Sequence, residues 1–413
     1  MSTVRYLAPD TDAYVDFIVQ NKSEFEQQSG LTLETHIIPT DAYYSNQIGK
    51  YLDSEEPPDV FMSGPVLLWE HLGKNRVQPL DDFVANASEE FDFDDFYPRL
   101  IQSNRWSTKF GDRLGHGPLW EIPVNWESYN LVYHPGALER ARLDVPRTWD
   151  DYLACAHAIA RLPGQTYWGF AQRGMQVWHT MYTGFATQYW TCGGTDFNSD
   201  GTCAIAGATS VSITTQFIEG LKKAGPPDWT NRRWYELAMD FAAGKYGLMV
   251  DSDHYVAYFE NVDTSRMARH TGYALPPTNS HGDRKPNMWT WSLAMNARSK
   301  SKRKAWQFME WAAGKSVLER TAYRGNMNPT RRSIWNSEVF QEYSAPWGAF
   351  YPVSTSLVED YAQVLVTPSV RYREIADRWV TALLTAYQGT DVSHALSEAA
   401  ADIDTITSNK LVI

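Results

Sequence analysis

Two carboxylates separated by a single residue form the group in this chain that is best suited to bind a ligand or to act as acid and base. Asp251 and Asp253 lie in the run Asp251-Ser-Asp-His-Tyr255, directly after the apolar segment 246–250. Carboxylates at this spacing can accept hydrogen bonds from sugar hydroxyls, or can hold a cation. Together with Glu127 they could also serve as the acid and base of a glycoside hydrolase. The alternative without a ligand is that Asp253 caps a helix.

Aromatic side chains are a second group suited to a ligand. The chain has 17 Trp, 23 Tyr and 17 Phe, which at 14% of the residues is more than hydrophobic cores alone usually need. A sugar packs the flat C–H face of its ring on an aromatic side chain while its hydroxyls hydrogen-bond in the plane. For any single Trp, core packing is the commoner role. Trp289 and Trp291 are alternate residues of a predicted strand and therefore point to one face.

The elements that must position these residues alternate between strands and helices with short connections, which indicates an α/β fold. Two domains are expected, because 413 residues exceed the size of a single hydrophobic core. Strands are expected at 4–7, 31–38, 58–62, 120–124, 167–170, 246–250, 272–275 and 291–296. Helices are expected from about Thr11 to Gly30, from Asp41 as a cap, at 66–72, 149–161, 210–223, 234–244 and 303–313, in an aromatic stretch ending at Trp190, and from Ile334 onward.

Residues that directly follow strands are the next candidates, because ligands in open α/β sheets bind beyond the carboxyl ends of the strands. Gly64 is included since its lack of a side chain would let the backbone approach a ligand. For Asp10 and Thr11, capping of the following helix is the alternative. The candidates of this kind are Asp10, Thr11, Asp12, Asp41, Tyr43, Ser63 and Gly64.

Metal and cofactor motifs are incomplete. The run Gly314-Lys-Ser316 lacks the upstream glycine and strand of a P-loop, so we interpret it as a helix end. The run 196–201 matches half of a calcium loop, but the twelfth position is Gly207 instead of a bidentate Glu, so a plain turn is expected. The histidines form no metal-binding pattern. We therefore expect no cofactor and no metal.

The three cysteines leave two alternatives open. Cys192 and Cys203 flank a turn-rich stretch that could bring their sulfur atoms together in a disulfide, or both could be free. Cys155 lies in a helical pattern that suits a small buried residue.

Charge and hydropathy exclude several partners. A net charge of −12 and an isoelectric point near 5.3 disfavour nucleic acid and anionic membrane surfaces, which need a basic footprint. No apolar run approaches the roughly 20 residues that span a bilayer. The chain begins Met1-Ser-Thr without a secretory signal, which taken literally indicates the cytoplasm. We interpret it instead as a mature chain with a replacement initiator.

Five of the apolar segments, in their order along the chain, resemble the signatures of extracellular solute-binding protein family 1, the carbohydrate receptors of ABC importers. The resemblance extends from the first strand to Asn328-Pro-Thr-Arg331 and the helical tail beyond it. The segments are Val4–Leu7, Pro58–Met62, Trp120–Val124, Tyr246–Val250 and Trp291–Met295. The resemblance implies a periplasmic-binding-protein-like type II fold, with two α/β lobes joined by a multi-strand hinge and a ligand cleft between them.

The resemblance also implies lobe boundaries and a mechanism. Residues 1–127 and 275–330 would form lobe 1, residues 128–274 lobe 2, and residues 331–413 the rest of lobe 2 and helices that pack on the hinge. A ligand that touches both lobes would stabilise a closed form by its differential affinity, and closure would signal occupancy to the permease.

Further site residues follow from the resemblance. Asn125, Trp126 and Glu127 match the segment that crosses the cleft and supplies a polar contact. Arg173, Trp178 and His179 lie where the family often places a stacking ring, with helix packing as the alternative for Trp178. One of Trp289 and Trp291 would stack on the ligand and the other would pack in the hinge. The remaining candidates are Asp251, Asp253, Tyr255, Arg324, Asn326 and Tyr372.

The function predicted from the sequence is capture of a sugar, oligosaccharide or sugar derivative for delivery to an ABC permease, without chemical change of the ligand. We expect a monomer in the periplasm or outside the cell, associated with the membrane through its permease. One alternative is the glycoside hydrolase described above. Another is a receptor for a non-sugar solute, either a polyamine held by the acidic turn or an anion held by Arg173 or Arg324.

Overall fold

The computed structural model describes residues 2–10, 13–45, 47–164, 167–182, 184–324 and 327–408. The chain divides into two compact units. Unit 1 is Met1–Glu127, Trp289–Tyr343 and Pro368–Val370, and unit 2 is Ser128–Met288, Ser344–Thr367 and Arg371–Ile413. The divisions fall after Glu127, Met288 and Tyr343, with a short return to unit 1 at Pro368–Val370. The lobe boundaries at 127, 274 and 330 that the resemblance implies stay a prediction.

Unit 1 is built on a mixed sheet with the strand order β2-β1-β3-β8-β4. The strands β1 (Thr3–Pro9), β2 (Thr32–Ile38) and β3 (Val60–Ser63) are parallel, and β8 (Met288–Met295) is antiparallel to β3. The register pairs Ser63 of β3 with Ser292 of β8. The long strand β4 (Glu121–Tyr133) begins in unit 1 and ends in unit 2.

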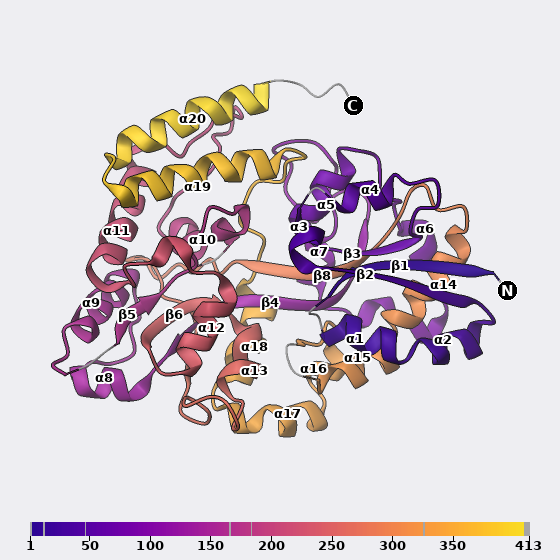
Figure 1. Cartoon of the computed structure of the whole chain (residues 1–413), viewed down its shortest axis with the longest axis horizontal. Helices are drawn as coiled ribbons and strands as arrows, with labels where there is room; N and C mark the ends of the chain where they lie inside the picture. Colours follow the sequence, from indigo (N-terminus) through magenta and orange to yellow (C-terminus); the bar gives the residue numbers. More distant parts are fainter. Residues whose placement is uncertain are drawn as a thin grey trace. The chain divides into compact units, whose positions relative to one another are not determined.

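Short helices cover both faces of this sheet (Figure 1). On one face, Phe308 of α14 contacts Tyr6 of β1 and Phe25 of α2, and on the other His71 of α5 contacts Phe61 of β3. The helices are α1 (Ala13–Gln20), α2 (Lys22–Ser29), α3 (Thr40–Tyr44), α4 (Ile48–Leu52), α5 (Pro65–Leu72), α6 (Asp81–Ala85), α7 (Pro98–Ser103), α14 (Lys302–Ala312), α15 (Lys315–Ala322), α16 (Arg332–Trp335) and α17 (Glu338–Ser344). Two 3-10 turns, Glu89–Phe91 and Phe93–Asp95, complete the unit.

Two helix predictions in unit 1 need correction. The single helix expected as far as Gly30 is two helices that meet at Asn21, whose backbone leaves the helical region (φ −110°, ψ 14°) and whose side-chain amide donates to Phe17 O at 2.8 Å. Gly30 does end α2, with a left-handed φ of 70°. Asp41 is not the cap of α3: Pro39 holds that position, and Asp41 lies in the first turn, where its charge still favours the helix dipole.

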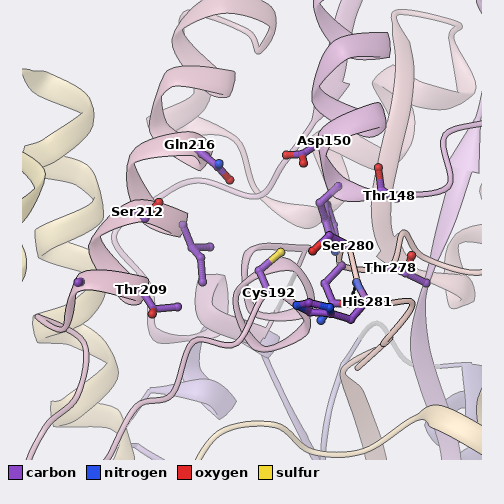
Figure 2. Close-up of a pocket in the computed structure, with 13 residues that line it drawn as sticks. Thr148, Asp150, Cys192, Thr209, Ser212, Gln216, Thr278, Ser280 and His281 are labelled. Carbon is purple, nitrogen blue, oxygen red and sulfur yellow. Dashed lines mark hydrogen bonds between the residues drawn. The ribbon is translucent and has the colours of Figure 1, made fainter.

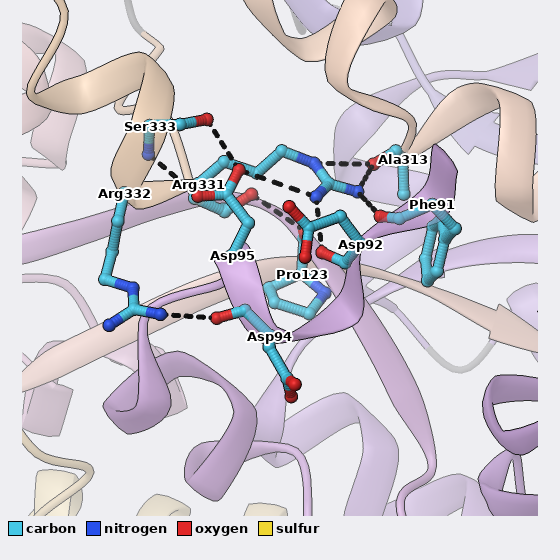
Figure 3. A network of polar contacts seen from close by, with 10 residues as sticks. Phe91, Asp92, Asp94, Asp95, Pro123, Ala313, Arg331, Arg332 and Ser333 are labelled. Atoms are coloured by element: carbon cyan, nitrogen blue, oxygen red, sulfur yellow. Dashed lines mark hydrogen bonds and ion pairs between the residues drawn. The ribbon is translucent and has the colours of Figure 1, made fainter. Parts of the chain in front are cut away.

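A fully buried arginine ties the late part of unit 1 to its early part (Figure 3). The Arg331 guanidinium donates to Ala313 O at 2.9 Å, Phe91 O at 2.7 Å and Asp92 O at 2.9 Å, and lies 3.7 Å from Asp95 Oδ2. Burial lowers the pKa of Arg331 to about 10, so the side chain remains charged at neutral pH. The charge is stabilised by carbonyl oxygens more than by its ion pair.

Unit 2 is built on a second group of strands. The strands β5 (Trp168–Ala171) and β6 (Tyr246–Ser252) are parallel, and β6 is antiparallel to the later part of β4. On its other edge, β4 pairs with β7 (Gly272–Ala274). The predicted strands 272–275 and 291–296 correspond to β7, which lies in unit 2, and to β8, most of which lies in unit 1.

The helices of unit 2 include the longest in the chain. Thr148 and Asp151 form a capping box that starts α9, and α19 packs lengthwise on α20 (Figure 1). The helices are α8 (Pro135–Ala141), α9 (Trp149–Ala160), α10 (Gly184–Thr191), α11 (Ala208–Ala224), α12 (Trp234–Ala242), α13 (Val256–Phe259), α18 (Phe350–Ser356), α19 (Tyr372–Gln388) and α20 (Val392–Ser408). Shorter turns are Trp178–Tyr182, Trp229–Asn231, Asp253–Tyr255 and Ala345–Trp347, with one π turn at Leu357–Tyr361.

Three local predictions can be compared with the structure. Cys192 and Cys203 are both free, so the disulfide alternative is not realised, and Cys155 is buried in α9 as expected. The calcium-like run is a turn: both Asp196 oxygens accept hydrogen bonds from Thr367. The helix C-cap expected at Gly314 needs correction: Ala313 is the C-cap of α14, and Gly314 is the N-cap of α15. None of the described helices is long and apolar enough to cross a membrane.

Candidate functional site

A buried ion pair is the centre of the polar cluster in unit 2. Arg173 Nε lies 3.1 Å from Asp251 Oδ2, and Arg173 Nη2 lies 2.5 Å from Asp251 Oδ1. The two side chains are 9% and 1% exposed. Asp251 Oδ1 also accepts a hydrogen bond from Ser252 N at 2.7 Å. The geometry is bidentate, which is the strongest form of this pair and fixes the orientation of both groups.

This pairing changes the chemistry that the sequence allowed for Asp251 and Arg173. The negative charge of Asp251 is balanced by Arg173, so the acidic turn is a poor site for a polyamine or another cation. Arg173 is equally a poor receptor for an anion, because its own charge is already matched. The pair is well suited to a neutral ligand with hydroxyl groups.

Aromatic rings surround the guanidinium of Arg173. It lies 5.9 Å from the ring centre of Tyr129 and 5.5 Å from that of Tyr255, whose hydroxyl accepts a hydrogen bond from Arg173 Nη2. Trp234 stacks on Tyr255 with 6.2 Å between ring centres and an angle of 17°. The predicted Tyr255 is therefore part of an aromatic and cationic cluster in which Tyr129 and Trp234 were not predicted.

Asp253 has a different partner from Asp251. Its Oδ1 accepts a hydrogen bond from Ser128 N at 3.0 Å, which joins the turn after β6 to β4. The capping alternative for Asp253 is not realised, because Ser252 holds the cap position and its hydroxyl accepts from His254 N. The side chain of Asp253 is 1% exposed.

The other predicted residues of unit 2 are also mostly buried. Trp178 is 7% exposed, and the guanidinium of Arg373 lies 5.6 Å from its ring. Burial and the neighbouring charge of Arg173 hold the pKa of His179 well below its usual range, so His179 is neutral at physiological pH. Tyr372 begins α19, is 5% exposed, and has a pKa raised by burial and by nearby Asp196.

A cluster of aromatic side chains lies at the carboxyl ends of the parallel strands in unit 1. Trp289 and Trp291 contact each other at 5.4 Å between ring centres, as expected for two rings on one strand face. Trp289 is 5% exposed, whereas Trp291 is half-buried and contacts the ring of Tyr44 at 5.8 Å. Trp291 is therefore better placed than Trp289 to present a ring surface to a ligand.

Gly64 lies against the neighbouring strand, and its predicted role in ligand binding stays a prediction. A Cβ at this position would lie 2.6 Å from Trp289 Cζ2 and 2.6 Å from Thr290 O. The space over the glycine is thus filled by the neighbouring strand. The glycine is needed so that Trp289 can pack against the end of β3.

Four polar candidates in unit 1 differ in exposure. Asp10 and Asp41 are exposed, and Asp10 Oδ1 accepts hydrogen bonds from the Thr40 main chain and hydroxyl, both at 2.7 Å. Tyr43 is 1% exposed and donates its hydroxyl proton to Met62 O, so it is a core residue in this structure. Ser63 is fully buried.

The three residues of the predicted crossing segment are also buried. Asn125 Oδ1 accepts from Asn328 N at 2.9 Å, and Trp126 Nε1 donates to Pro329 O at 2.9 Å. These two contacts fix the 328–331 turn to β4, which is a structural role. Glu127 is 8% exposed.

Four candidates in unit 1 remain to be placed. Arg324 is exposed, donates to Gln20 Oε1 at 2.9 Å and lies 5.1 Å from the ring of Phe17. Thr11, Asp12 and Asn326 lie outside the described residues.

A cavity of about 510 Å³ lies elsewhere in unit 2 (Figure 2). It is formed by the first turns of α9 and α11, Cys192 and the loop 278–281, and Asp150 and His281 are among its labelled side chains. None of the residues predicted from the sequence lines it. Among the described residues there is also no group of three His, Cys, Asp or Glu able to hold a metal.

Some residues of the polar cluster in unit 2 and of the aromatic cluster in unit 1 were not predicted from the sequence. Tyr44 directly follows the predicted Tyr43, and helical geometry turns one inward and the other toward Trp291. Glu121 is a charged residue inside the otherwise apolar segment 119–124, and this isolated charge was a signal that the analysis did not use. Tyr129 and Trp234 had no local signal, because only the fold brings them to Tyr255 and Arg173.

Comparison with protein families defines the class. A family model described as bacterial extracellular solute-binding protein matches residues 8–318. The chain belongs to that family. The α/β fold expected from the sequence is confirmed, and the family and the relatives described next are binding proteins.

Several similar proteins are named for sugar alcohols. The chain is 28% identical over 385 residues to an erythritol/L-threitol-binding protein of Mycolicibacterium smegmatis, covering 91% of this chain and 80% of the relative. Among solved structures, an ABC transporter solute-binding protein of Agrobacterium radiobacter in complex with ribitol matches with a TM-score of 0.85 at 19% identity, covering 98% of both chains. One from Agrobacterium vitis with bound D-mannitol matches with a TM-score of 0.82 at 20% identity, covering 99% of both. The likeness to these two structures shows the fold.

Proposed function

We propose that this protein is the solute-binding component of an ABC importer for a small polyol. The observation that carries the proposal is the buried Arg173–Asp251 pair, which is charge-balanced and flanked by the rings of Tyr129 and Tyr255. A neutral ligand rich in hydroxyl groups needs such a site: fixed donors and acceptors without net charge, beside apolar ring faces. The names of the relatives, which include erythritol, L-threitol, ribitol and D-mannitol, support an acyclic polyol as the ligand.

Residues of both units would take part. In unit 2 the candidates are Arg173, Asp251, Asp253, Tyr255 and, as additions, Tyr129 and Trp234. In unit 1 the most accessible candidates are Asp10, Asp41, Tyr44 and Trp291, and the buried Glu127 is a further candidate. The buried Tyr43, Asn125, Trp126, Trp178, Trp289 and Tyr372 would act by supporting these groups.

The hydrolase alternative is less well supported by these contacts. A general acid or base must be free to exchange a proton with the substrate. Asp251 is held in two hydrogen bonds by Arg173, and Asp253 accepts a hydrogen bond from Ser128 N. The ligand would be released intact to a permease, outside the cytoplasm, which agrees with a family of extracellular receptors.

A thermal-shift and calorimetric screen tests the proposal. The ligands are erythritol, L-threitol, ribitol, D-mannitol, D-glucose and maltose, and each is analysed by chromatography after incubation. We expect at least one polyol to raise the melting temperature and to be recovered unchanged, since a ligand that binds only the folded state stabilises it. Binding of maltose alone would replace the polyol by an oligosaccharide, and shortened products would support the hydrolase.

A further inference from the structure

Glu121 is a buried carboxyl group for which the fold provides no partner. It is the first residue of β4 and is fully buried. Among the described residues, neither of its oxygens has a hydrogen-bond partner, and the same is true of the hydroxyl of Ser63 beside it. A buried polar group without a partner is unfavourable, so such groups usually meet a ligand or a water molecule.

Within the described part of the chain, no positively charged group lowers the pKa of Glu121. The Ser63 hydroxyl is close enough to lower the carboxyl pKa slightly, although the two groups do not meet hydrogen-bond geometry. Tyr43 of α3 is the other polar neighbour, and burial raises its own pKa. Burial raises the pKa of Glu121 to about 8. At neutral pH the side chain is therefore a carboxylic acid that can both donate and accept a hydrogen bond.

The place of this pair in unit 1 connects it to the candidate site. Ser63 is the last residue of β3, at the edge where ligands bind in open α/β sheets. Its partner in the sheet is Ser292, which directly follows the half-buried Trp291. Ser63 thus lies at the strand end where a ligand is expected, one β8 residue away from Trp291 and on the opposite face of the strand.

We propose that the Glu121 carboxyl and the Ser63 hydroxyl together bind one hydroxyl group of the ligand. The inference rests on the proposed function and adds a recognition element that favours polyols over analogues lacking that hydroxyl. A site built to hydrogen-bond a hydroxyl rejects the analogue without it, because its own groups are then left unpaired.

Calorimetric titration tests this with the polyol that binds the wild-type protein best in the screen, and with its mono-deoxy analogues. The variants are Glu121→Met, Glu121→Gln and Ser63→Ala. The control is Asp59→Asn, since Asp59 is a buried carboxyl of unit 1 that already bonds Arg5 N and Ser299 Oγ. We expect Glu121→Met to bind at least tenfold more weakly and Glu121→Gln to stay within about threefold, because the amide still donates and accepts.

The deoxy analogues distinguish direct contact from an indirect effect. One analogue should bind the wild-type protein at least tenfold more weakly yet show no further loss with Glu121→Met. Unchanged affinity in Glu121→Met and Ser63→Ala would overturn the inference and assign the pair to a buried water. An equal loss of affinity for every analogue, or a loss as large in Asp59→Asn, would also overturn it. If the wild-type protein binds no polyol, the proposed function fails first.

Discussion

Charge compensation is the main feature of this protein at the scale of single residues. The sequence presents Asp251, Asp253 and Arg173 as separate charged residues that could hold a cation, an anion or a reacting sugar. In the structure, Arg173 and Asp251 neutralise each other in a buried bidentate pair. Arg173, which is 78 residues away from Asp251 in the sequence, therefore determines what the acidic turn can bind. No local sequence pattern indicates this pairing.

Breaking the Arg173–Asp251 pair should destabilise the protein. Asp251→Asn and Arg173→Met each leave a buried partner without its counter-charge, which costs about 3–5 kcal/mol in comparable cases. Urea unfolding monitored by Trp fluorescence measures the loss. The control is Glu219→Gln in the exposed Lys223–Glu219 pair, for which we expect no measurable change. A loss no greater than that of the control would contradict a stabilising role of the pair.

The raised pKa of Glu121 predicts that folding stability depends on pH. The pKa is about 8 in the folded protein, against 4.5 for an unperturbed glutamate side chain. Between these two values the folded state holds a proton that the unfolded state has released. Folding stability contributed by this group therefore falls as pH rises from 4.5 to 8 and is constant above and below, with a slope of at most about 1.4 kcal/mol per pH unit.

Denaturant unfolding of wild type and Glu121→Gln at several pH values measures this effect. Between pH 4.5 and 8, the free energy of unfolding of Glu121→Gln should rise relative to that of the wild type. Below pH 4.5, the difference between the two free energies should be constant. A difference that is the same at every pH would show that Glu121 titrates normally.

At the scale of elements, the ends of strands and helices are fixed by close packing more than by local sequence signals. The strands were predictable because their apolar runs, although short, are separated by turns. The break of the first helix at Asn21 and the cap of α3 were not, since both depend on which backbone atoms a single residue meets. Gly64 was predicted for its lack of a side chain, but only the structure shows that Trp289 fills the space.

Gly64→Ala should disturb the packing of β8 on β3. The added methyl would lie 2.6 Å from both Trp289 Cζ2 and Thr290 O, and overpacking of this kind costs about 1–3 kcal/mol. The matched control is Gly136→Ala in α8, where the nearest atom is His134 Cε1 at 3.1 Å, on a side chain that can move. Thermal unfolding compares the two. Equal melting temperatures would mean that β8 can shift to make room.

Arg331→Met should loosen the connection between the 91–95 turns and the late part of unit 1. The variant leaves the carbonyl oxygens of Ala313, Phe91 and Asp92 without their donor, and each buried unmet group costs about 1–3 kcal/mol. The control is Arg332→Met, because Arg332 is exposed and donates to Asp94 O at 2.6 Å. Hydrogen exchange of residues 89–96 measures the effect. Protection that is unchanged in Arg331→Met would contradict it.

At the scale of the whole molecule, the sequence was sufficient to predict the class of protein but not the identity of its ligand. The order of short apolar segments predicted an α/β solute-binding protein, and the family match over residues 8–318 agrees. The candidate site was predictable only in outline. Asp251 and Tyr255 could be chosen because they follow a strand, whereas Tyr44, Tyr129, Trp234 and Glu121 become candidates through contacts between distant segments. The choice of ligand depends on such contacts, which explains why a polyol could not be selected from sequence patterns alone.

Isothermal titration of the purified protein with erythritol, L-threitol, ribitol and D-mannitol tests the central claim most directly. The account predicts saturable binding of at least one of them with a stoichiometry of one, and loss of that binding in Asp251→Asn under conditions where the variant remains folded. Absence of heat with all four polyols, or unchanged affinity in Asp251→Asn, would contradict it.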